Sequence, residues 1–104
     1  MQRRFDVLRW TPDRIAHVQR HSVEPEEADE VLADPGADMR RGRDGCYLLY
    51  GRTEDGRPLL LVLVDETERV AGPVTARDAT DAERRTYFGG STDAEREIDD
   101  GEGG

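Results

Sequence analysis

Arginine is the residue type through which this chain could act on a ligand. All 15 basic residues are Arg and none is Lys, so every cationic contact must be made by a planar guanidinium group, which can hold two phosphate oxygens at once. With 24 acidic residues present, many of these arginines are expected to form surface ion pairs instead. The candidates for phosphate contact flank expected strands and a C-terminal helix: Arg40, Arg41, Arg43, Arg52, Arg57, Arg77, Arg84 and Arg85.

Histidine and cysteine offer a second kind of chemistry. His17 and His21 are four residues apart, and Asp13 extends the same helical stripe, so a metal hydrolase is one alternative. The chain lacks an HExxH motif, and a single helix face seldom closes a metal site, so we expect no metal and no other cofactor. The single cysteine, Cys46, opens an apolar strand and is expected in the core. Trp10 and Tyr50 are also expected in the core rather than as platforms for base stacking.

The elements that must position these residues follow from hydrophobic periodicity and from local start and stop signals. Thr11 and Pro12 begin a helix, Thr80 and Glu83 form a capping box before another, and Asp55-Gly56 predicts a β-hairpin turn. The expected strands are residues 5–10, 39–43, 46–53, 58–64 and 69–77, and the expected helices are residues 12–21, 25–33 and 81–88.

The apolar run at residues 58–64 predicts a central strand that is covered on both faces, and Gly72-Pro73 predicts a bulge or an edge position in the strand after it. The order of elements predicts an α+β fold, in which two N-terminal helices and one C-terminal helix pack on a small antiparallel sheet.

Length and charge restrict the class of protein. The 104 residues predict one domain, residues 1–90, followed by an acidic tail, residues 91–104, that is expected to be disordered. The tail carries six acids and one Arg, and the whole chain has a net charge of -9. This charge excludes a globally basic nucleic-acid binder but not a local arginine cluster. The longest apolar run is too short to span a membrane, no signal peptide is apparent, and a cytoplasmic protein is expected.

Several segments together resemble the BrnT-type toxins. An aromatic strand at residues 5–10 precedes Arg20-His21-Ser22-Val23, which is similar to that family's "KHGV" segment, and Glu26-Glu27-Ala28, which matches its "EEA". The stretch Val74-Thr75-Ala76-Arg77-Asp78-Ala79, with Glu83, Arg84, Arg85 and Tyr87, is similar to the family's "ISAR-A…E-R..Y" ending. The resemblance covers roughly residues 5–88. Arg20 replaces the Lys of "KHGV" and Ser22 replaces its Gly.

The resemblance implies a RelE-like fold and the toxin of a type II toxin-antitoxin system, which inhibits translation as a metal-independent endoribonuclease (RNA interferase). Such enzymes direct an RNA 2′-OH onto the adjacent phosphate, which requires proton carriers and cations. Arg77 and Arg84 would stabilise the phosphorane, His21 would carry a proton, and Tyr87 or Glu83 would assist. Contacts to the RNA phosphates would come from Arg43, Arg52 and Arg85.

The resemblance also implies a partner and leaves an alternative open. The partner would be a ribbon-helix-helix antitoxin of the BrnA type, in a two-plus-two complex. A net charge of -9 is unusual for a protein that approaches RNA. A non-catalytic RelE-like binding or regulatory module is therefore the alternative to a ribonuclease. The acidic tail would be either an inert solubilising segment or a segment that folds over the arginine cluster.

Overall fold

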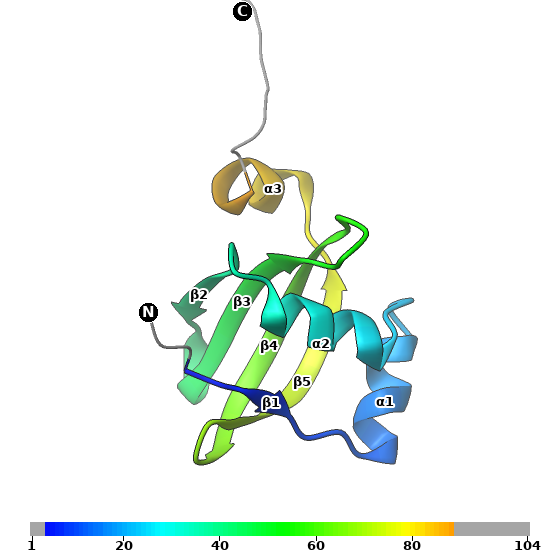
Figure 1. Ribbon diagram of the computed structural model, residues 1–104, viewed down its shortest axis with the longest axis vertical. Helices are drawn as coiled ribbons and strands as arrows, with labels where there is room; N and C mark the ends of the chain where they lie inside the picture. The colour runs from blue at the N-terminus through cyan, green and yellow to red at the C-terminus, as the bar shows by residue number, and fades with distance from the viewer. Residues whose placement is uncertain (1–3, 89–104) are drawn as a thin grey trace, which may run out of the picture.

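A computed structural model describes residues 4–88 of the chain (Figure 1). The predicted acidic tail and the last two residues of the predicted domain lie outside the described residues. The helices are α1 (Pro12–Gln19), α2 (Pro25–Ala33) and α3 (Asp81–Tyr87), and a 3-10 turn, η1, spans Arg43–Gly45. The strands are β1 (Val7–Leu8), β2 (Asp38–Arg41), β3 (Cys46–Arg52), β4 (Pro58–Thr67) and β5 (Val70–Asp78).

The five described strands form one sheet in the order β1-β5-β4-β3-β2. Strands β2 to β5 are antiparallel neighbours, which confirms the predicted α+β fold. The short strand β1 differs from the prediction because it joins the sheet parallel to β5, with Val7 opposite Val70. Only two of the six residues predicted for this strand form a ladder, and Val7 is 52% exposed. This pairing is non-local, so the hydrophobic pattern at residues 5–10 does not specify it.

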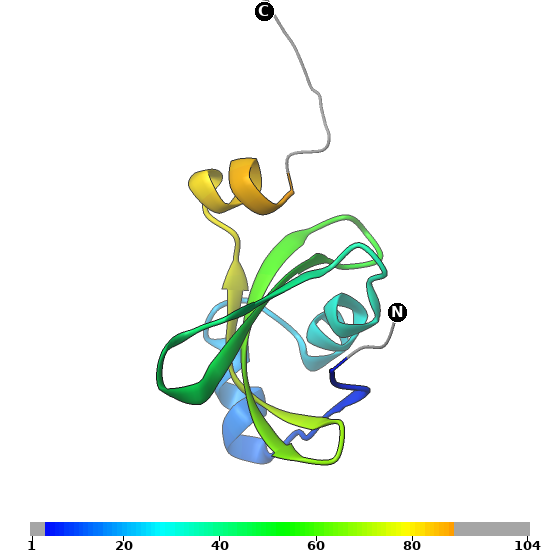
Figure 2. The same ribbon diagram turned by 90° about the vertical axis from the view of Figure 1, so that its left-hand side faces the viewer.

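The two faces of the sheet differ in what covers them. Helix α2 lies across the inner face and α1 lies beside β5 (Figure 1). The inner face forms the core together with Phe5 and these two helices. The buried residues of this core include Tyr47, Leu49, Leu59, Leu61 and Leu63 from the sheet, Val18 from α1 and Val31 from α2. Alternation along the strands places Leu48, Tyr50, Leu60, Val62, Thr75 and Arg77 on the outer face. Helix α3 stands beyond one end of the sheet in both views (Figure 2).

Strand β4 is the middle strand and is covered on both faces only over its first part. Leu60 and Leu61 point to opposite faces and are 4% and 0% exposed, as predicted. Val62 and Val64 are half-buried on the outer face. Cys46, which was predicted to be a core residue, is also half-buried. The outer face is thus closed near α3 and more open towards its other end.

Local signals in the sequence are confirmed at the element boundaries. The Thr11 hydroxyl accepts a hydrogen bond from the Arg14 N–H, and Thr80 and Glu83 form the predicted capping box. Gly56 has a φ of 90°, which closes the β3–β4 hairpin in a conformation that favours glycine. The predicted bulge lies in β5, where Val62 pairs with Thr75 and Leu63 pairs with Pro73, so Val74 is the extra residue.

Gly51 lets α2 approach the sheet closely. A Cβ atom at this position would lie 2.9 Å from Cγ1 of Val31 and 3.0 Å from Cβ of Ala37. The Asp34 carboxylate, just after α2, accepts a hydrogen bond from the Arg52 N–H at 2.8 Å. These contacts fix α2 against the end of β3. None of the helices in residues 4–88 is long and apolar enough to cross a membrane.

Candidate functional site

Arg77, near the end of β5, is held by the first turn of α3. Its two terminal nitrogens each lie 2.9 Å from one oxygen of the Glu83 carboxylate, and Nη1 also donates to the Asp78 carbonyl at 3.0 Å. The same carboxylate accepts a hydrogen bond from the Thr80 N–H at 2.9 Å. The capping box of α3 therefore aims Glu83 at Arg77, so a local helix signal builds the pair.

In this pair, Arg77 and Glu83 each stabilise the charged form of the other. The hydrogen bonds from Arg77 are the main reason that the pKa of Glu83 is lowered, and Thr80 adds to the effect. The same hydrogen bonds raise the pKa of Arg77. The Arg77 side chain is 38% exposed and that of Glu83 is 19% exposed. A guanidinium group that is charged, oriented and still open to solvent is suited to an incoming phosphate.

An aromatic stack fastens α3 to the outer face. The Tyr87 ring lies parallel to the Tyr50 ring, with centroids 3.9 Å apart, and Phe88 meets Tyr50 edge-on at 6.4 Å. The guanidinium carbon of Arg40 lies 5.2 Å from the centroid of the Tyr87 ring. Burial raises the pKa of Tyr50, and the Glu83 carboxylate adds to this effect. The aromatic stack thus lies close enough to Glu83 for an electrostatic interaction between Tyr50 and the carboxylate.

Further arginines surround the exit of the chain from α3. The Arg52 guanidinium donates to the Gly56 carbonyl at 3.1 Å and to the Phe88 carbonyl at 3.5 Å, and lies over the Phe88 ring at 5.1 Å. Arg84 and Arg85 are exposed and precede Phe88 by one helical turn. The structure therefore brings together Arg52, Arg77, Arg84, Arg85 and Tyr87 of the predicted site.

His21 and Arg43 lie apart from this group. Arg43 is in η1, at the far end of β3 from Arg52, and the strand between them is about 20 Å long. His21 follows α1, and its ring lies 5.5 Å from that of His17. Within residues 4–88, no direct contact joins His21 to Arg77.

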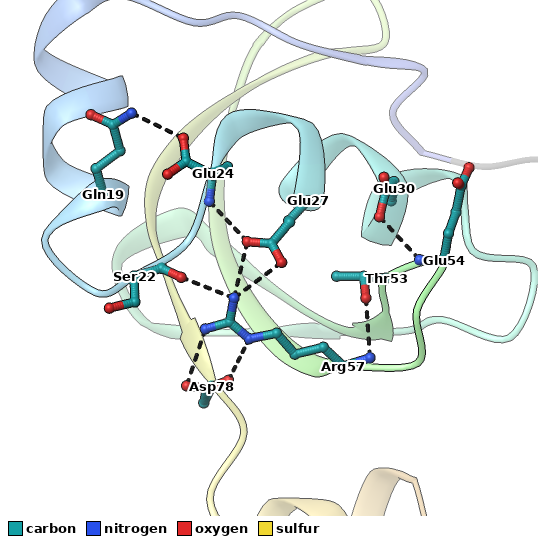
Figure 3. Close-up of polar contacts among 9 residues, drawn as sticks. All are labelled: Gln19, Ser22, Glu24, Glu27, Glu30, Thr53, Glu54, Arg57 and Asp78. Carbon is teal, nitrogen blue, oxygen red and sulfur yellow. Dashed lines mark hydrogen bonds and ion pairs between the residues drawn. The ribbon is translucent and has the colours of Figure 1, made fainter.

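The turn that carries His21 is tied to β5 through Arg57 (Figure 3). Nη1 of Arg57 donates to the Ser22 carbonyl at 2.9 Å and to the Glu27 carboxylate at 2.9 and 3.1 Å. Nε and Nη2 donate to the Asp78 carboxylate at 2.8 and 3.2 Å. The hydrogen bond from Arg57 is the main reason that the pKa of Asp78 is lowered. Each nitrogen of the Arg57 guanidinium group thus has a partner within the protein, and Arg57 joins the turn that follows His21 to the end of β5.

Comparison with known proteins bears on the fold. No family of known proteins matches the sequence, and no curated protein matches it. A crystal structure of the Brucella abortus ribonuclease toxin BrnT superimposes with a TM-score of 0.58 at 9% identity, over 71% of this chain and 96% of that one. The chain has a BrnT-type fold. At this identity the likeness concerns the fold alone.

The BrnT-type fold leaves the arginines of the predicted site in two classes. Among residues 4–88, Arg77 and Arg84 each have a carboxylate partner, Glu83 at 2.9 Å and Asp81 at 3.9 Å. The three predicted phosphate-binding residues, Arg43, Arg52 and Arg85, form no ion pair with any carboxylate in the same described range. A guanidinium group without an ion pair can accept a phosphate without first losing a carboxylate partner.

The predicted metal alternative finds no support in this BrnT-type fold. No group of three or more His, Cys, Asp or Glu side chains that could hold a metal ion occurs in the described part of the chain. Asp13, His17 and His21 therefore do not converge as a three-ligand set.

Sequence reasoning underestimated Tyr50 and Arg40. Tyr50 was predicted to be a core residue, and it is 5% exposed, but its burial is on the outer face against α3. The period-two alternation of β3 carries this signal, since Tyr50 shares a face with Leu48 and not with Leu49. Arg40 approaches Tyr87 from β2, a contact between distant segments that no local pattern specifies.

Proposed function

We propose that this protein is the toxin of a type II toxin-antitoxin system and that it cleaves RNA without a metal ion. The observation that carries the proposal is the Arg77–Glu83 pair at the α3 end of a BrnT-type fold, in which the guanidinium side chain is 38% exposed. The Brucella abortus protein with this fold is a ribonuclease toxin. The predicted resemblance of residues 74–87 to the same family points to the same arginine.

The pair supplies a cation and a base at one place. In the proposed reaction, the RNA 2′-OH attacks the adjacent phosphate, the 5′-oxygen leaves, and a 2′,3′-cyclic phosphate remains. Arg77 turns from Glu83 to the scissile phosphate and stabilises the charge that develops on it. Glu83, once it loses this partner, accepts the 2′-OH proton. Arg84 adds positive charge, and the Tyr87 hydroxyl assists with proton transfer.

His21 is the proposed donor of the proton to the leaving oxygen. Histidine is the side chain whose ordinary pKa lies nearest neutrality. Arg57 joins the turn that follows His21 to the end of β5 through Ser22 and Asp78. Proton donation therefore requires the scissile phosphate to lie between Arg77 and this turn, where His21 can reach the leaving oxygen. We expect His21→Ala to lower the cleavage rate about 100-fold and His17→Ala, at its half-buried neighbour on α1, to lower it less than about twofold. Equal rates for the two variants would remove His21 from the mechanism.

The proposed RNA path and partner complete this function. Arg52 and Arg85 hold phosphates beside α3, and Arg43 holds one at the far end of β3. A protein with this activity inhibits translation in the cytoplasm and requires neutralisation by an antitoxin. We propose a ribbon-helix-helix antitoxin of the BrnA type in a two-plus-two complex.

A second candidate is a non-catalytic RelE-like module that binds a partner. The observation that favours it is the closure of Arg77 by Glu83, which leaves this guanidinium group no free fork in the absence of ligand. The net charge of -9 favours it as well. The two candidates differ in whether RNA is cut.

The experiment is incubation of the full chain with single-stranded RNA in EDTA, followed by analysis of the new 3′ ends. The proposal predicts cleavage with 2′,3′-cyclic phosphate ends. Cleavage that requires added magnesium would contradict the mechanism. No cleavage by the folded chain, combined with no growth arrest on its induction in cells, would favour the non-catalytic module.

A further inference from the structure

The exit of the chain from α3 carries an exposed positive surface, which we call the exit surface and define as Arg52, Arg84 and Arg85. Arg52 and Arg85 have no carboxylate partner among residues 4–88, and the Arg84 side chain is 57% exposed with its one carboxylate oxygen at 3.9 Å. Among residues 4–88, five of the 13 arginines have no carboxylate partner: Arg20, Arg41, Arg43, Arg52 and Arg85. The other described arginines, including Arg4, Arg9, Arg14, Arg40, Arg57, Arg69 and Arg77, have carboxylate partners.

The described part of the chain ends at this surface. The Phe88 carbonyl accepts a hydrogen bond from Arg52, and the Phe88 ring lies under the same guanidinium group. Residues 89–104 follow directly, and they include Asp93, Glu95, Glu97, Asp99, Asp100 and Glu102 against Arg96 alone. Sixteen residues can reach at most about 53 Å, and the first acid is five residues from Phe88. The most acidic stretch of the sequence is therefore attached beside the arginines that have no carboxylate partner.

We propose that the acidic segment, residues 91–104, docks on the exit surface of its own chain and competes there with RNA phosphates. The competition rests on the proposed function, whereas the docking does not. Tethering gives the segment an effective concentration in the millimolar range for a surface so close to its origin. The contact is between exposed charges, so salt weakens it, with a Debye length of about 10 Å at 0.1 M ionic strength.

Docking accounts for the charge balance of the chain. An acidic segment on the exit surface keeps weakly bound polyanions away and yields to an RNA that also engages Arg77 and Arg43. The segment carries five net negative charges, which is enough to replace several phosphates. These charges are spaced more widely than the phosphates of a nucleic acid. The occupant of the exit surface is thus part of the protein, and the salt concentration sets how strongly it binds there.

The test compares the full chain with a variant that carries Glu97→Gln, Asp99→Asn and Asp100→Asn. The matched control carries Asp13→Asn, Glu26→Gln and Glu68→Gln, three exposed acids on α1, on α2 and between β4 and β5. The first readout is the NMR signal of each arginine Nε–Hε group at 50 mM and 500 mM salt. Docking predicts that the tail variant moves the Arg52 and Arg85 signals at low salt only, and leaves Arg20, an exposed and equally unpaired arginine at the end of α1, unmoved.

Three outcomes would overturn docking. In the first, the Arg52 and Arg85 signals do not move in the tail variant. In the second, they move equally in the matched control. In the third, dilution of the wild-type chain moves them to the positions seen in the tail variant. The last outcome would assign the segment to a second copy.

The second readout is the affinity for a single-stranded RNA. Competition predicts that the tail variant binds about fivefold more tightly than wild type at 50 mM salt and that the matched control binds less than about twofold more tightly. Equal affinities of the two variants would overturn competition. Moved arginine signals together with no RNA binding by any of the proteins would confirm docking and refute the proposed function instead.

Discussion

Arg57 and Arg77 lie near the same end of the sheet and serve different purposes. Arg57 donates to Ser22, Glu27 and Asp78, three residues on different elements, and its side chain is 27% exposed. Arg77 has one carboxylate partner, Glu83, and is 38% exposed. An arginine whose donors join three elements stabilises the fold, whereas one held by a single carboxylate and one nearby backbone carbonyl can exchange that carboxylate for a phosphate. The number of partners separates scaffold from site better than charge does.

The largest effect on stability is expected at Arg57. Arg57→Ala removes the guanidinium partner of the Ser22 carbonyl and of the Glu27 and Asp78 carboxylates at once, so the free energy of unfolding should fall by about 2 kcal/mol. Arg77→Ala removes a partner only from the Glu83 carboxylate and the Asp78 carbonyl, and the Arg77 side chain is itself more exposed than that of Arg57, so the fall should be less than about 1 kcal/mol. Urea unfolding of both variants measures the difference. An equal loss of stability would break the distinction between them.

A smaller effect is expected from the helix caps, and here the two regions can be matched. Thr80→Ala and Thr11→Ala each remove one hydroxyl that caps a helix, at α3 and α1 respectively, and each should cost about 1 kcal/mol. Only Thr80→Ala loosens Glu83, so only this variant should also lower RNA cleavage, by about tenfold. The cleavage rates of the two folded variants check this. If the Thr11 variant lost as much activity, the loss would follow global stability and not the site.

The smallest effect is expected from acid. The pKa of Glu83 is lowered by Arg77, so the pair stabilises the fold above the unfolded pKa of a glutamate, about 4.3, and this stability is lost as the pH falls through the lowered pKa. Glu83→Gln should therefore be less stable than wild type by about 0.5 kcal/mol at pH 7, with the gap closing below about pH 4. Thermal unfolding across this range measures the gap. A gap that widened in acid would mean that the proton on Glu83 is favoured by the fold, against the arrangement seen.

Much of the fold is local and could be predicted. The Thr11 cap, the Thr80–Glu83 box and the Asp55-Gly56 turn each place a boundary through interactions within a few residues. The parallel pairing of Val7 with Val70 was not predictable in this way, because it joins residues 63 positions apart.

In the candidate site, too, local contacts could be predicted and contacts between distant residues could not. Arg77 and Glu83 are six residues apart, and the capping box that aims one at the other is written in the sequence. Whether Arg57 was scaffold or site could not be read from the chain, because its partners lie 21 to 35 residues away. Likewise, no pattern at residues 43 and 52 shows that these arginines lack carboxylate partners in the described fold, since that depends on where every nearby acid is placed.

The central claim is that Arg77 acts on RNA and Arg57 does not. The most direct measurement is the single-turnover rate of RNA cleavage in EDTA by wild type, Arg77→Ala and Arg57→Ala, at a temperature where circular dichroism shows all three to be folded. The account predicts a fall of about 100-fold to 1000-fold for Arg77→Ala and of less than about tenfold for Arg57→Ala. Cleavage by Arg77→Ala at the wild-type rate would contradict the account.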